Sequence, residues 1–208
     1  MADLGKHKEL EVKFFIGDLG PMEQQLRDFG AELAQARTHE YNLRFDDPAG
    51  SLSEALSLLR LRRDIGIRLT FKGPSTTLGG VLARKEIEFE VSDFELARKF
   101  VESLGFTRKF VYEKYRTTYN LDGCKITLDE MPYGNFVEVE GPDADVIRKA
   151  ADKLKLDWEQ RLPETYVDIF QRIKDLQNLK FTDLTFENFR NVDVSLARIG
   201  IQSAALVS

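Results

Sequence analysis

Apolar and charged residues alternate along several stretches of this chain, most clearly in residues 9–16. Successive side chains of an extended strand point to opposite faces, so Leu10 and Val12 share one face while Glu9 and Glu11 share the other. A single strand of this kind is typical of an antiparallel sheet with one solvated face. The same pattern returns in strand after strand, however, and this repetition calls for a different interpretation.

Seven further segments show the same period of two and predict strands. They are residues 39–46, 59–62, 67–72, 84–91, 110–118, 124–129 and 136–140. Asp122-Gly123, between two of these segments, is a strong hairpin signal. The stretch 73–80 is rich in Gly, Ser and Thr and predicts a loop.

Apolar residues at helical spacing predict four helices between and after these strands. The predicted helices cover residues 22–36, 92–105, 143–156 and 164–176, and residues 51–58 predict a short helical connection. Ser92 followed by Glu95 predicts a capping box, and Gly105 predicts the other end of that helix. We expect one domain over residues 1–176 and a C-terminal extension, 177–208, that docks on it through scattered aromatic and aliphatic side chains.

Length and composition agree with this division and limit the function. A chain of 208 residues can form one domain with a substantial core. Its single cysteine, Cys124, excludes an internal disulfide framework and fits a reducing compartment. The polar residues 1–8 do not resemble a signal peptide, and no apolar run reaches the roughly 18 residues of a membrane span. We therefore expect a cytoplasmic protein without a membrane partner.

The net charge of −5 argues against a nucleic-acid partner bound through bulk positive charge, so the placement of charge matters more than its total. The polar faces of the predicted strands are rich in Arg and Glu, which bind phosphate and hard metal ions. If the apolar faces pack outward against helices, the charged faces meet inside a closed barrel. This pattern predicts an α+β fold, an eight-stranded antiparallel β-barrel or tunnel with helices outside. Buried charges need partners, which an anionic ligand and a divalent cation would supply.

The order of several motifs resembles the CYTH or triphosphate tunnel metalloenzyme superfamily, which includes thiamine triphosphatases, inorganic triphosphatases and class IV adenylyl cyclases. The resemblance covers about residues 9–170. Its motifs are Glu-x-Glu-x-Lys at 9–13, Leu-Arg-Leu-Arg at 59–62, Lys72 before Gly-Pro, Arg-x-Glu-x-Glu at 84–88, Glu-Lys-x-Arg at 113–116, Asp129, and Glu-x-Glu at 138–140. The resemblance implies a tunnel that binds a small triphosphate with Mg²⁺ or Mn²⁺, and a homodimer, since members are often dimers.

Roles for individual residues follow from the resemblance and from the predicted barrel. The residues implied to bind phosphate are Lys13, Arg60, Arg62, Lys72, Lys114 and Arg116, and the charged faces add Arg44, Arg84 and Lys125. The residues implied to hold metal and position water are Glu9, Glu11, Asp129, Glu138 and Glu140, with Glu86 and Glu88 in the same acidic set. Lys13, Glu11 and Arg116 are the candidates for direct catalytic roles.

The reaction itself stays open at this point between hydrolysis and cyclisation. We favour a metal-dependent triphosphatase, because class IV cyclases carry a His-Phe pair ahead of the Glu-x-Glu-x-Lys motif and here His7 is followed by Lys8. Class IV adenylyl cyclase is the alternative. A non-catalytic polyphosphate or nucleotide sensor is the second alternative, but it predicts loss of one charged set, and both sets are present. Nothing in the sequence identifies the organic part of the substrate, because Tyr112, Tyr133 and Tyr166 are typical of core or rim packing.

Overall fold

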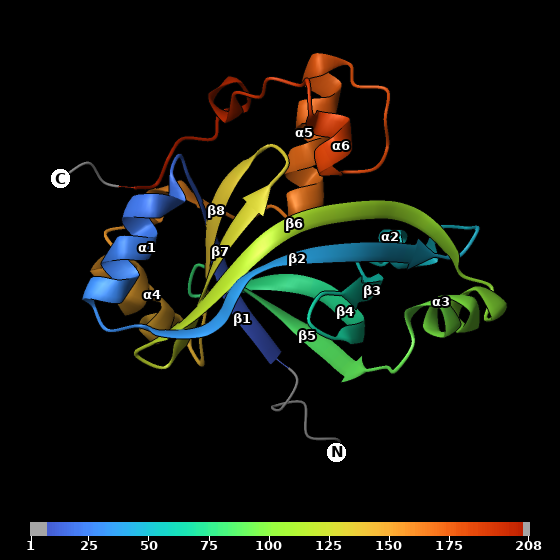
Figure 1. Cartoon of the computed structure of the whole chain (residues 1–208), viewed down its shortest axis with the longest axis horizontal. Coiled ribbons are helices and arrows are strands. Elements are labelled where there is room, and N and C mark those ends of the chain that lie inside the picture. The colour runs from blue at the N-terminus through green and yellow to red at the C-terminus, as the bar shows by residue number, and fades with distance from the viewer. Residues whose placement is uncertain (1–7, 206–208) are drawn as a thin grey trace.

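The computed structural model describes residues 8–205, and eight antiparallel strands in it close into a barrel (Figure 1). The strands are β1 (Lys8–Ile16), β2 (Glu32–Asp46), β3 (Leu58–Arg63), β4 (Ile67–Leu78), β5 (Val81–Glu90), β6 (Thr107–Leu121), β7 (Cys124–Met131) and β8 (Gly134–Glu140). They follow the order β5-β4-β3-β2-β6-β7-β8-β1, and a pairing between β5 and β1 completes the ring. The predicted eight-stranded barrel is confirmed.

Strand β1 closes the barrel by pairing with three other strands. Its first half pairs with β5, where Glu9 lies opposite Arg84, and its second half pairs with β8, where Lys13 lies opposite Glu138. The two-residue strand β9 (Arg161–Leu162) pairs with the second half of β1, beyond the end of β5. Closure leaves few unpaired strand edges and fixes which side chains face inward.

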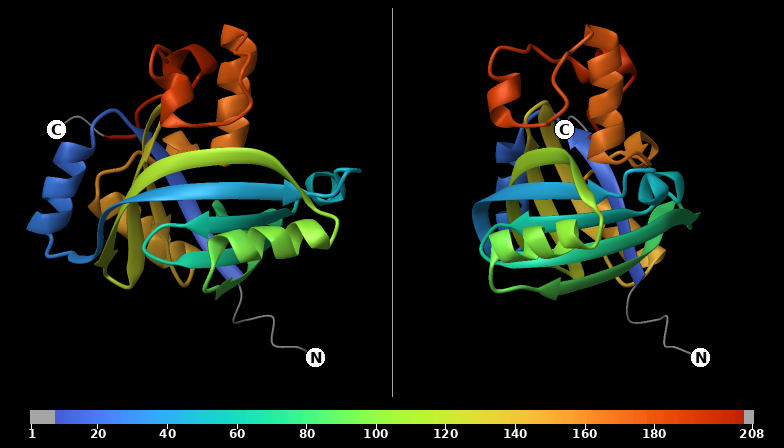
Figure 2. Two further views of the ribbon diagram at one scale, coloured as in Figure 1. Left: turned by 45° about the vertical axis from the view of Figure 1, so that its right-hand side comes forward. Right: turned by 90° about the vertical axis from the view of Figure 1, so that its right-hand side faces the viewer.

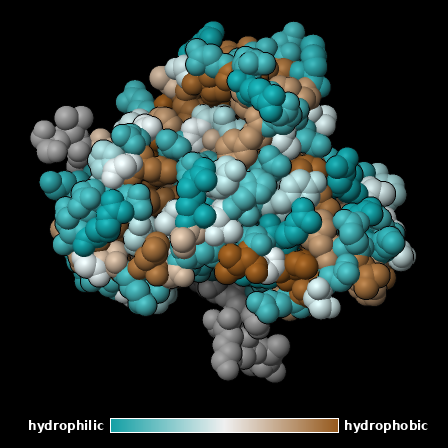
Figure 3. Space-filling model, viewed as in Figure 1, coloured by the Kyte–Doolittle hydropathy of each residue, from teal (hydrophilic) through white to brown (hydrophobic). Residues whose placement is uncertain are grey.

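Helices cover the outside of the barrel, as Figure 2 shows from two sides. They are α1 (Leu19–Asp28), α2 (Ser51–Glu54), α3 (Phe94–Ser103), α4 (Ala144–Lys153), α5 (Tyr166–Gln177) and α6 (Phe186–Phe189), with 3₁₀ helices η2 (Trp158–Gln160) and η3 (Leu196–Ile199). No helix within residues 8–205 is long and apolar enough to cross a membrane. Polar side chains cover most of the face seen in Figure 3. Phe89 and Phe100 are among the exposed apolar residues of the described chain as a whole.

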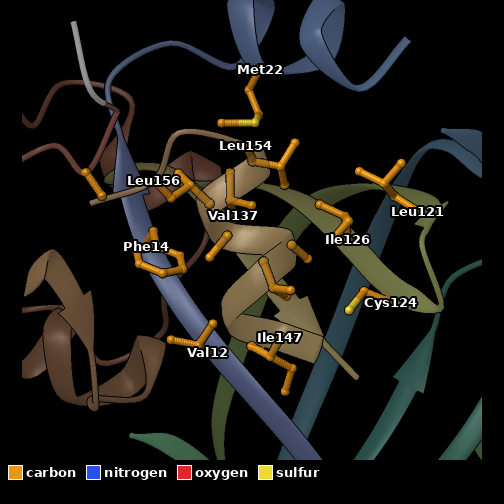
Figure 4. Close-up of a cluster of buried hydrophobic side chains, with 14 of the residues drawn as sticks. Val12, Phe14, Met22, Leu121, Cys124, Ile126, Val137, Ile147, Leu154 and Leu156 are labelled. Carbon is orange, nitrogen blue, oxygen red and sulfur yellow. The ribbon is translucent and has the colours of Figure 1, made fainter. Parts of the chain in front are cut away.

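The largest apolar core lies between the outer faces of β1, β7 and β8 and the helices α1 and α4 (Figure 4). Phe14, Val137 and Ile147 in this core have no exposed surface, and burying a side chain of this size stabilises the fold by roughly 2 to 3 kcal/mol. Gly141 lets α4 approach the sheet, because a Cβ there would lie 2.9 Å from Ile147 Cγ1 and 3.0 Å from Cys124 Sγ. The apolar faces therefore point outward, and the charged faces point into the barrel.

Two predicted segments are wrong. The helix predicted at 22–36 ends at Asp28, because Gly30 adopts a φ of +72° and the chain then enters β2. Leu33, placed on the helix by its spacing, is a strand residue with 53% of its surface exposed. The loop predicted at 73–80 is mostly strand, since β4 continues to Leu78 and turns at Gly79 and Gly80.

Three other helix boundaries differ more modestly from the expectation. Helix α3 is capped by Asp93, whose carboxylate accepts the Leu96 N–H at 2.8 Å, and not by Ser92. A capping box is present instead at α5, formed by Thr165 and Asp168. The connection predicted as helical over 51–58 is helical only in α2, since β3 begins at Leu58.

The segment 178–205 follows the barrel wall rather than leaving it. The Glu113 N–H donates to the Leu184 carbonyl at 2.9 Å, and the Leu184 N–H donates to the Val111 carbonyl at 2.8 Å. Further along, the Ala204 N–H donates to the Phe15 carbonyl at 2.8 Å. Leu184 and Ala204 have no exposed surface. This segment therefore contributes to the packing around β1 and β6.

Replacing Leu184 by alanine is expected to lower the free energy of unfolding by about 3 kcal/mol, because it leaves a cavity in a fully buried site. Urea denaturation measures this change. Leu176→Ala is the matched control, since Leu176 is 47% exposed and its loss should cost roughly 0.5 kcal/mol or less. Equal effects of the two substitutions would show that the segment does not pack as described.

Candidate functional site

The charged faces of all eight strands enclose a cavity of about 870 Å³ that runs inside the barrel. Its volume lies in the range of small-ligand sites. Every predicted site residue except Asp129 lines this cavity. Helix α5 also borders the cavity through Tyr166, Phe170 and Lys174, so α5 does more than cover the outside.

On the β1, β4 and β5 side of the cavity, cations and carboxylates pair across the strands. Lys72 Nζ lies 2.6 Å from Glu9 Oε2 and 3.0 Å from Glu86 Oε2. Arg84 binds Glu9 through Nε at 3.0 Å and Glu11 through Nη2 at 3.3 Å. Burial by itself would raise the pKa of Glu9, but Lys72 and Arg84 outweigh it and lower this pKa to about 2. Glu9 is therefore ionised at neutral pH.

On the β6, β7 and β8 side, Arg116 is the centre of a second group. Its Nε and Nη2 atoms donate to the two oxygens of Asp129 at 2.6 and 2.5 Å, and Nη2 also donates to Glu138 at 2.5 Å. Lys114 Nζ donates to Asp129 Oδ2 at 2.9 Å. Burial by itself would raise the pKa of Glu138, but Lys13 and Arg116 hold it well below its usual range.

Two residues of this group were not predicted as site residues. Glu40 on β2 is 1% exposed and lies 3.5 Å from Arg62 and 3.6 Å from Lys114. The sequence did indicate that Glu40 faces the interior, because it is an even number of residues from Arg44 on the same strand and so lies on the same face. Tyr166 on α5 was expected to pack in the core or rim, but its ring centroid lies 4.2 Å from Lys13 Nζ, close enough for a cation–π contact.

The carboxylates near β1 have the donor chemistry of a Mg²⁺ or Mn²⁺ site. Burial raises the pKa of Glu11, and the negative charges of Glu138 and Glu9 raise it further. These three acids therefore repel one another, and a divalent cation bound by their oxygens would relieve that repulsion. Within residues 8–205, no three His, Cys, Asp or Glu side chains are already close enough together to form a metal site. Metal binding would thus require the carboxylates to exchange some of their contacts with Lys and Arg.

Arg44 differs from the other inward-facing arginines because no described carboxylate lies within 4.0 Å of it. Burial lowers the pKa of Arg44, the charges of Tyr112 and Asp168 oppose this shift, and the charges of Arg60 and Arg84 add to it. By contrast, Arg60 has Glu88 at 3.4 Å and Arg84 has Glu9 at 3.0 Å. A half-buried cation without a carboxylate at contact distance favours an anion from outside the chain.

Tyr112 lies in the same part of the cavity and accepts a hydrogen bond from Arg60 Nη1 at 3.2 Å. Burial by itself would raise the pKa of its phenol. The charges of Arg60, Arg62 and Lys114 outweigh burial and lower this pKa from 10.0 to about 8. Tyr133 and Tyr166 behave oppositely, since burial and nearby carboxylates raise their pKa values well above 10.0.

One tyrosine is therefore expected to ionise near pH 8 when absorbance at the phenolate band is followed in ligand-free protein, and Tyr112→Phe should remove this step. Bound tripolyphosphate should move the step to higher pH, because a nearby anion disfavours the phenolate. The folded pKa lies below the unfolded value of 10.0, so wild type should gain stability over Tyr112→Phe as pH rises from about 8 to about 10, and not below about 8. An unchanged midpoint with tripolyphosphate would place the anion away from Tyr112.

Comparison with known proteins identifies this arrangement of strands and charges. The sequence model of the CYTH domain matches residues 7–173. The chain belongs to the CYTH domain family. This CYTH domain extends from β1 into α5, and α6 and η3 lie beyond it. The expected superfamily resemblance is confirmed, whereas the comparison with curated proteins gives no significant match.

Solved structures share the CYTH fold. A conserved hypothetical protein from Pyrococcus furiosus is 27% identical over 77% of this chain and 98% of its own, with a TM-score of 0.64. A candidate adenylate cyclase from Vibrio parahaemolyticus is 17% identical over 79% of this chain and 98% of its own, with a TM-score of 0.72. A Hippeastrum protein named for adenylyl cyclase and described with a dominant triphosphatase activity is 18% identical over 79% of this chain and 95% of its own, with a TM-score of 0.61. The last two similarities concern the fold alone.

His7, the residue compared with the His-Phe pair of class IV cyclases, lies outside the described residues. The structure therefore adds nothing to that comparison. The distinction between hydrolysis and cyclisation depends on the cavity itself.

Proposed function

We propose that this CYTH protein is a divalent-metal-dependent hydrolase of triphosphates. The observation that carries the proposal is Arg44, a cavity-lining cation with no described carboxylate within 4.0 Å, whose charged surroundings comprise Asp168, Arg60 and Arg84. A ligand with several negative charges would compensate all three guanidinium groups at once. Guanidinium groups bind phosphate oxygens with two parallel hydrogen bonds, so a chain of phosphates is the best match.

The remaining cations of the cavity would hold the rest of the triphosphate. Lys13, Lys72 and Lys114 contact carboxylates on adjacent strands, which are Glu138, Glu86 and Asp129, so their ammonium groups are already oriented before a ligand enters. Phosphoryl transfer depends mainly on such fixed charges around the non-bridging oxygens. Arg116 is suited to stabilise the charge that develops on the transferred phosphoryl group, because Asp129 and Glu138 fix its guanidinium plane.

Glu9, Glu11 and Glu138 are proposed to hold the metal. When bound there, Mg²⁺ or Mn²⁺ would neutralise charge on the phosphate oxygens and polarise the phosphorus for attack. Glu11, as one of these carboxylates, would also position the attacking water. The presence of both charged sets favours an enzyme over a module that only binds.

Cyclisation of ATP is the second candidate, favoured by the aromatic side chains at one end of the cavity. Phe110 and Phe170 both line it, and their ring centroids are 5.9 Å apart. Phe170 is 2% exposed, so the half-buried Phe110 is the ring of this pair with surface for stacking on a nucleobase. The cations would bind the phosphates in the same way, but the 3′-hydroxyl of the ribose would replace water as the nucleophile.

The deciding experiment measures phosphate release from tripolyphosphate, thiamine triphosphate and ATP, with cyclic AMP and pyrophosphate measured in parallel. Orthophosphate without cyclic AMP is the expected result. Cyclic AMP formed from ATP with little orthophosphate would instead establish cyclisation. Arg44→Ala should raise KM by about tenfold, on the order of a lost charge-assisted contact. The matched control is Arg108→Ala, since Arg108 is exposed and absent from the described cavity lining. Equal kinetics of the two variants would remove the argument from Arg44.

A further inference from the structure

The buried acids inside the barrel differ in their access to the cavity. Glu9, Glu11 and Glu138 line it, whereas Glu40 and Asp129 do not appear in its described lining. Glu40 is 1% exposed and Asp129 is fully buried. Both nevertheless contact cations that do line the cavity. The cations therefore lie between the cavity and the carboxylates of Glu40 and Asp129.

The hydrogen bonds of Asp129 leave little capacity for a metal ion. Oδ1 accepts from Arg116 Nε at 2.6 Å. Oδ2 accepts from Arg116 Nη2 at 2.5 Å, from Lys114 Nζ at 2.9 Å and from the Tyr166 hydroxyl at 2.7 Å. A carboxylate offers about four acceptor positions, and four donors already approach this one. Unlike Glu9, Glu11 and Glu138, Asp129 does not line the cavity, so a metal ion could bind it only by displacing the Lys and Arg that separate it from the cavity.

Glu40 holds the neighbouring cations by charge rather than by short hydrogen bonds. Its carboxylate lies 3.5 Å from Arg62 Nη1, 3.6 Å from Lys114 Nζ and 3.9 Å from Arg116 Nε. Burial would raise the pKa of Glu40, but Lys114, Arg62 and Arg116 hold it well below its ordinary value. Glu40 is therefore ionised and keeps three cations of like charge close together.

We propose that Asp129 and Glu40 are positioning residues of the triphosphate site, which hold Lys114, Arg116 and Arg62 in place from behind and bind no metal. This inference rests on the proposed function and assigns the metal to the carboxylates that line the cavity. It also replaces the role in metal binding that the family resemblance implies for Asp129. Fixed cations accelerate phosphoryl transfer because no reorganisation is needed as charge develops on the phosphate oxygens.

Asp129→Asn, Glu40→Gln and Glu138→Gln form the test set, because each substitution keeps shape and removes one negative charge. Mn²⁺ affinity is measured by electron paramagnetic resonance, which detects free Mn²⁺ without any turnover. Asp129→Asn should lower kcat/KM for tripolyphosphate by about 100-fold, and Glu40→Gln by about tenfold, with Mn²⁺ affinity unchanged within about threefold. Glu138→Gln should lower Mn²⁺ affinity by at least about tenfold, since it removes a proposed ligand.

The direction of the change in kcat/KM of Asp129→Asn distinguishes a positioning role from an effect of charge alone. Removing a negative charge next to the cations should by itself favour an anionic ligand, so a fall in kcat/KM reports lost geometry. Tyr166→Phe gives a milder check if Asp129→Asn does not fold, since it removes one hydrogen bond to Asp129 and keeps the ring beside Lys13. It should lower kcat, by roughly threefold or more, without changing Mn²⁺ affinity.

Loss of Mn²⁺ affinity in Asp129→Asn equal to that of Glu138→Gln would overturn this inference and leave the proposed function intact. Normal kcat/KM in both Asp129→Asn and Tyr166→Phe would overturn it as well. Wild-type protein that binds neither Mn²⁺ nor tripolyphosphate would instead overturn the proposed function, and this inference with it. The binding measurements on wild type thus distinguish the two failures.

Discussion

Arg116→Ala is expected to lower kcat/KM for the preferred triphosphate by about 100-fold or more, on the order of 3 kcal/mol. Its guanidinium bridges Asp129 and Glu138 through bonds of 2.5 to 2.6 Å, so it is held rigidly between two strands at the cavity wall. Arg116→Lys should recover only part of the loss, because an ammonium keeps the charge but cannot form the two parallel bonds. Steady-state kinetics of the three proteins measures this order.

The control for Arg116 is Arg148→Ala. Arg148 is an exposed residue of α4 that pairs with Asp152 at 3.0 Å on the same helix, and its loss should leave kcat/KM unchanged. Circular dichroism establishes that each variant is folded. Folded Arg116→Ala protein with wild-type kinetics would mean that Arg116 only pairs across the sheet and has no role in the reaction.

Removal of divalent metal is expected to abolish turnover. Glu9, Glu11 and Glu138 lie close enough for the acidic neighbours to raise the pKa of Glu11, and a triphosphate would add further negative charge beside them. Without a cation this repulsion disfavours the bound state. Dialysis against EDTA followed by a phosphate-release assay measures the effect, and added Mg²⁺ or Mn²⁺ should restore the rate. Full activity in EDTA would refute the metal assignment.

The architecture could be predicted from the sequence because a strand carries its burial pattern in a period of two. Glu9, Arg60 and Glu138 all fall in the charged phase of their strands, and all three contribute to one interior. A solvated face would not need this concentration of Arg and Glu. The location of the cavity therefore followed from local sequence, before any contact between strands was known.

What the sequence could not give was the pairing inside the barrel. The family resemblance implies a metal-binding role for Asp129, and the structure adds that the strand register places this residue opposite Arg116 and that α5 brings Tyr166 to the same carboxylate. The contact with Tyr166 depends on the packing of α5, which no local pattern encodes, whereas the contact with Arg116 follows from the register of the hairpin at Asp122-Gly123. Glu40 shares the inward face of β2 with Arg44 and could have been identified from this phase, but it belongs to no repeated acidic motif and was therefore missed.

The missed boundaries have local causes. Leu26, Phe29 and Leu33 match a helical period, but Gly30 turns the chain before Leu33, so the same spacing spans a helix and a strand. In β4 the Gly, Ser and Thr residues after Lys72 were interpreted as a loop. They form an irregular part of the strand, where the register with β5 shifts between Lys72 and Ser75.

The position of β1 in the barrel also determines how the chain folds. Lys13 lies opposite Glu138 and Leu162, so β1 pairs fully only with segments that are distant from it in the sequence. Pairings this distant in sequence make folding slow, because a long loop has to close before any contact rewards it. Until then the strand that carries Glu9, Glu11 and Lys13 is hydrated and separated from its counter-charges. Closure of β1 desolvates these charges together, so we expect the slow step of folding to coincide with the assembly of the binding site.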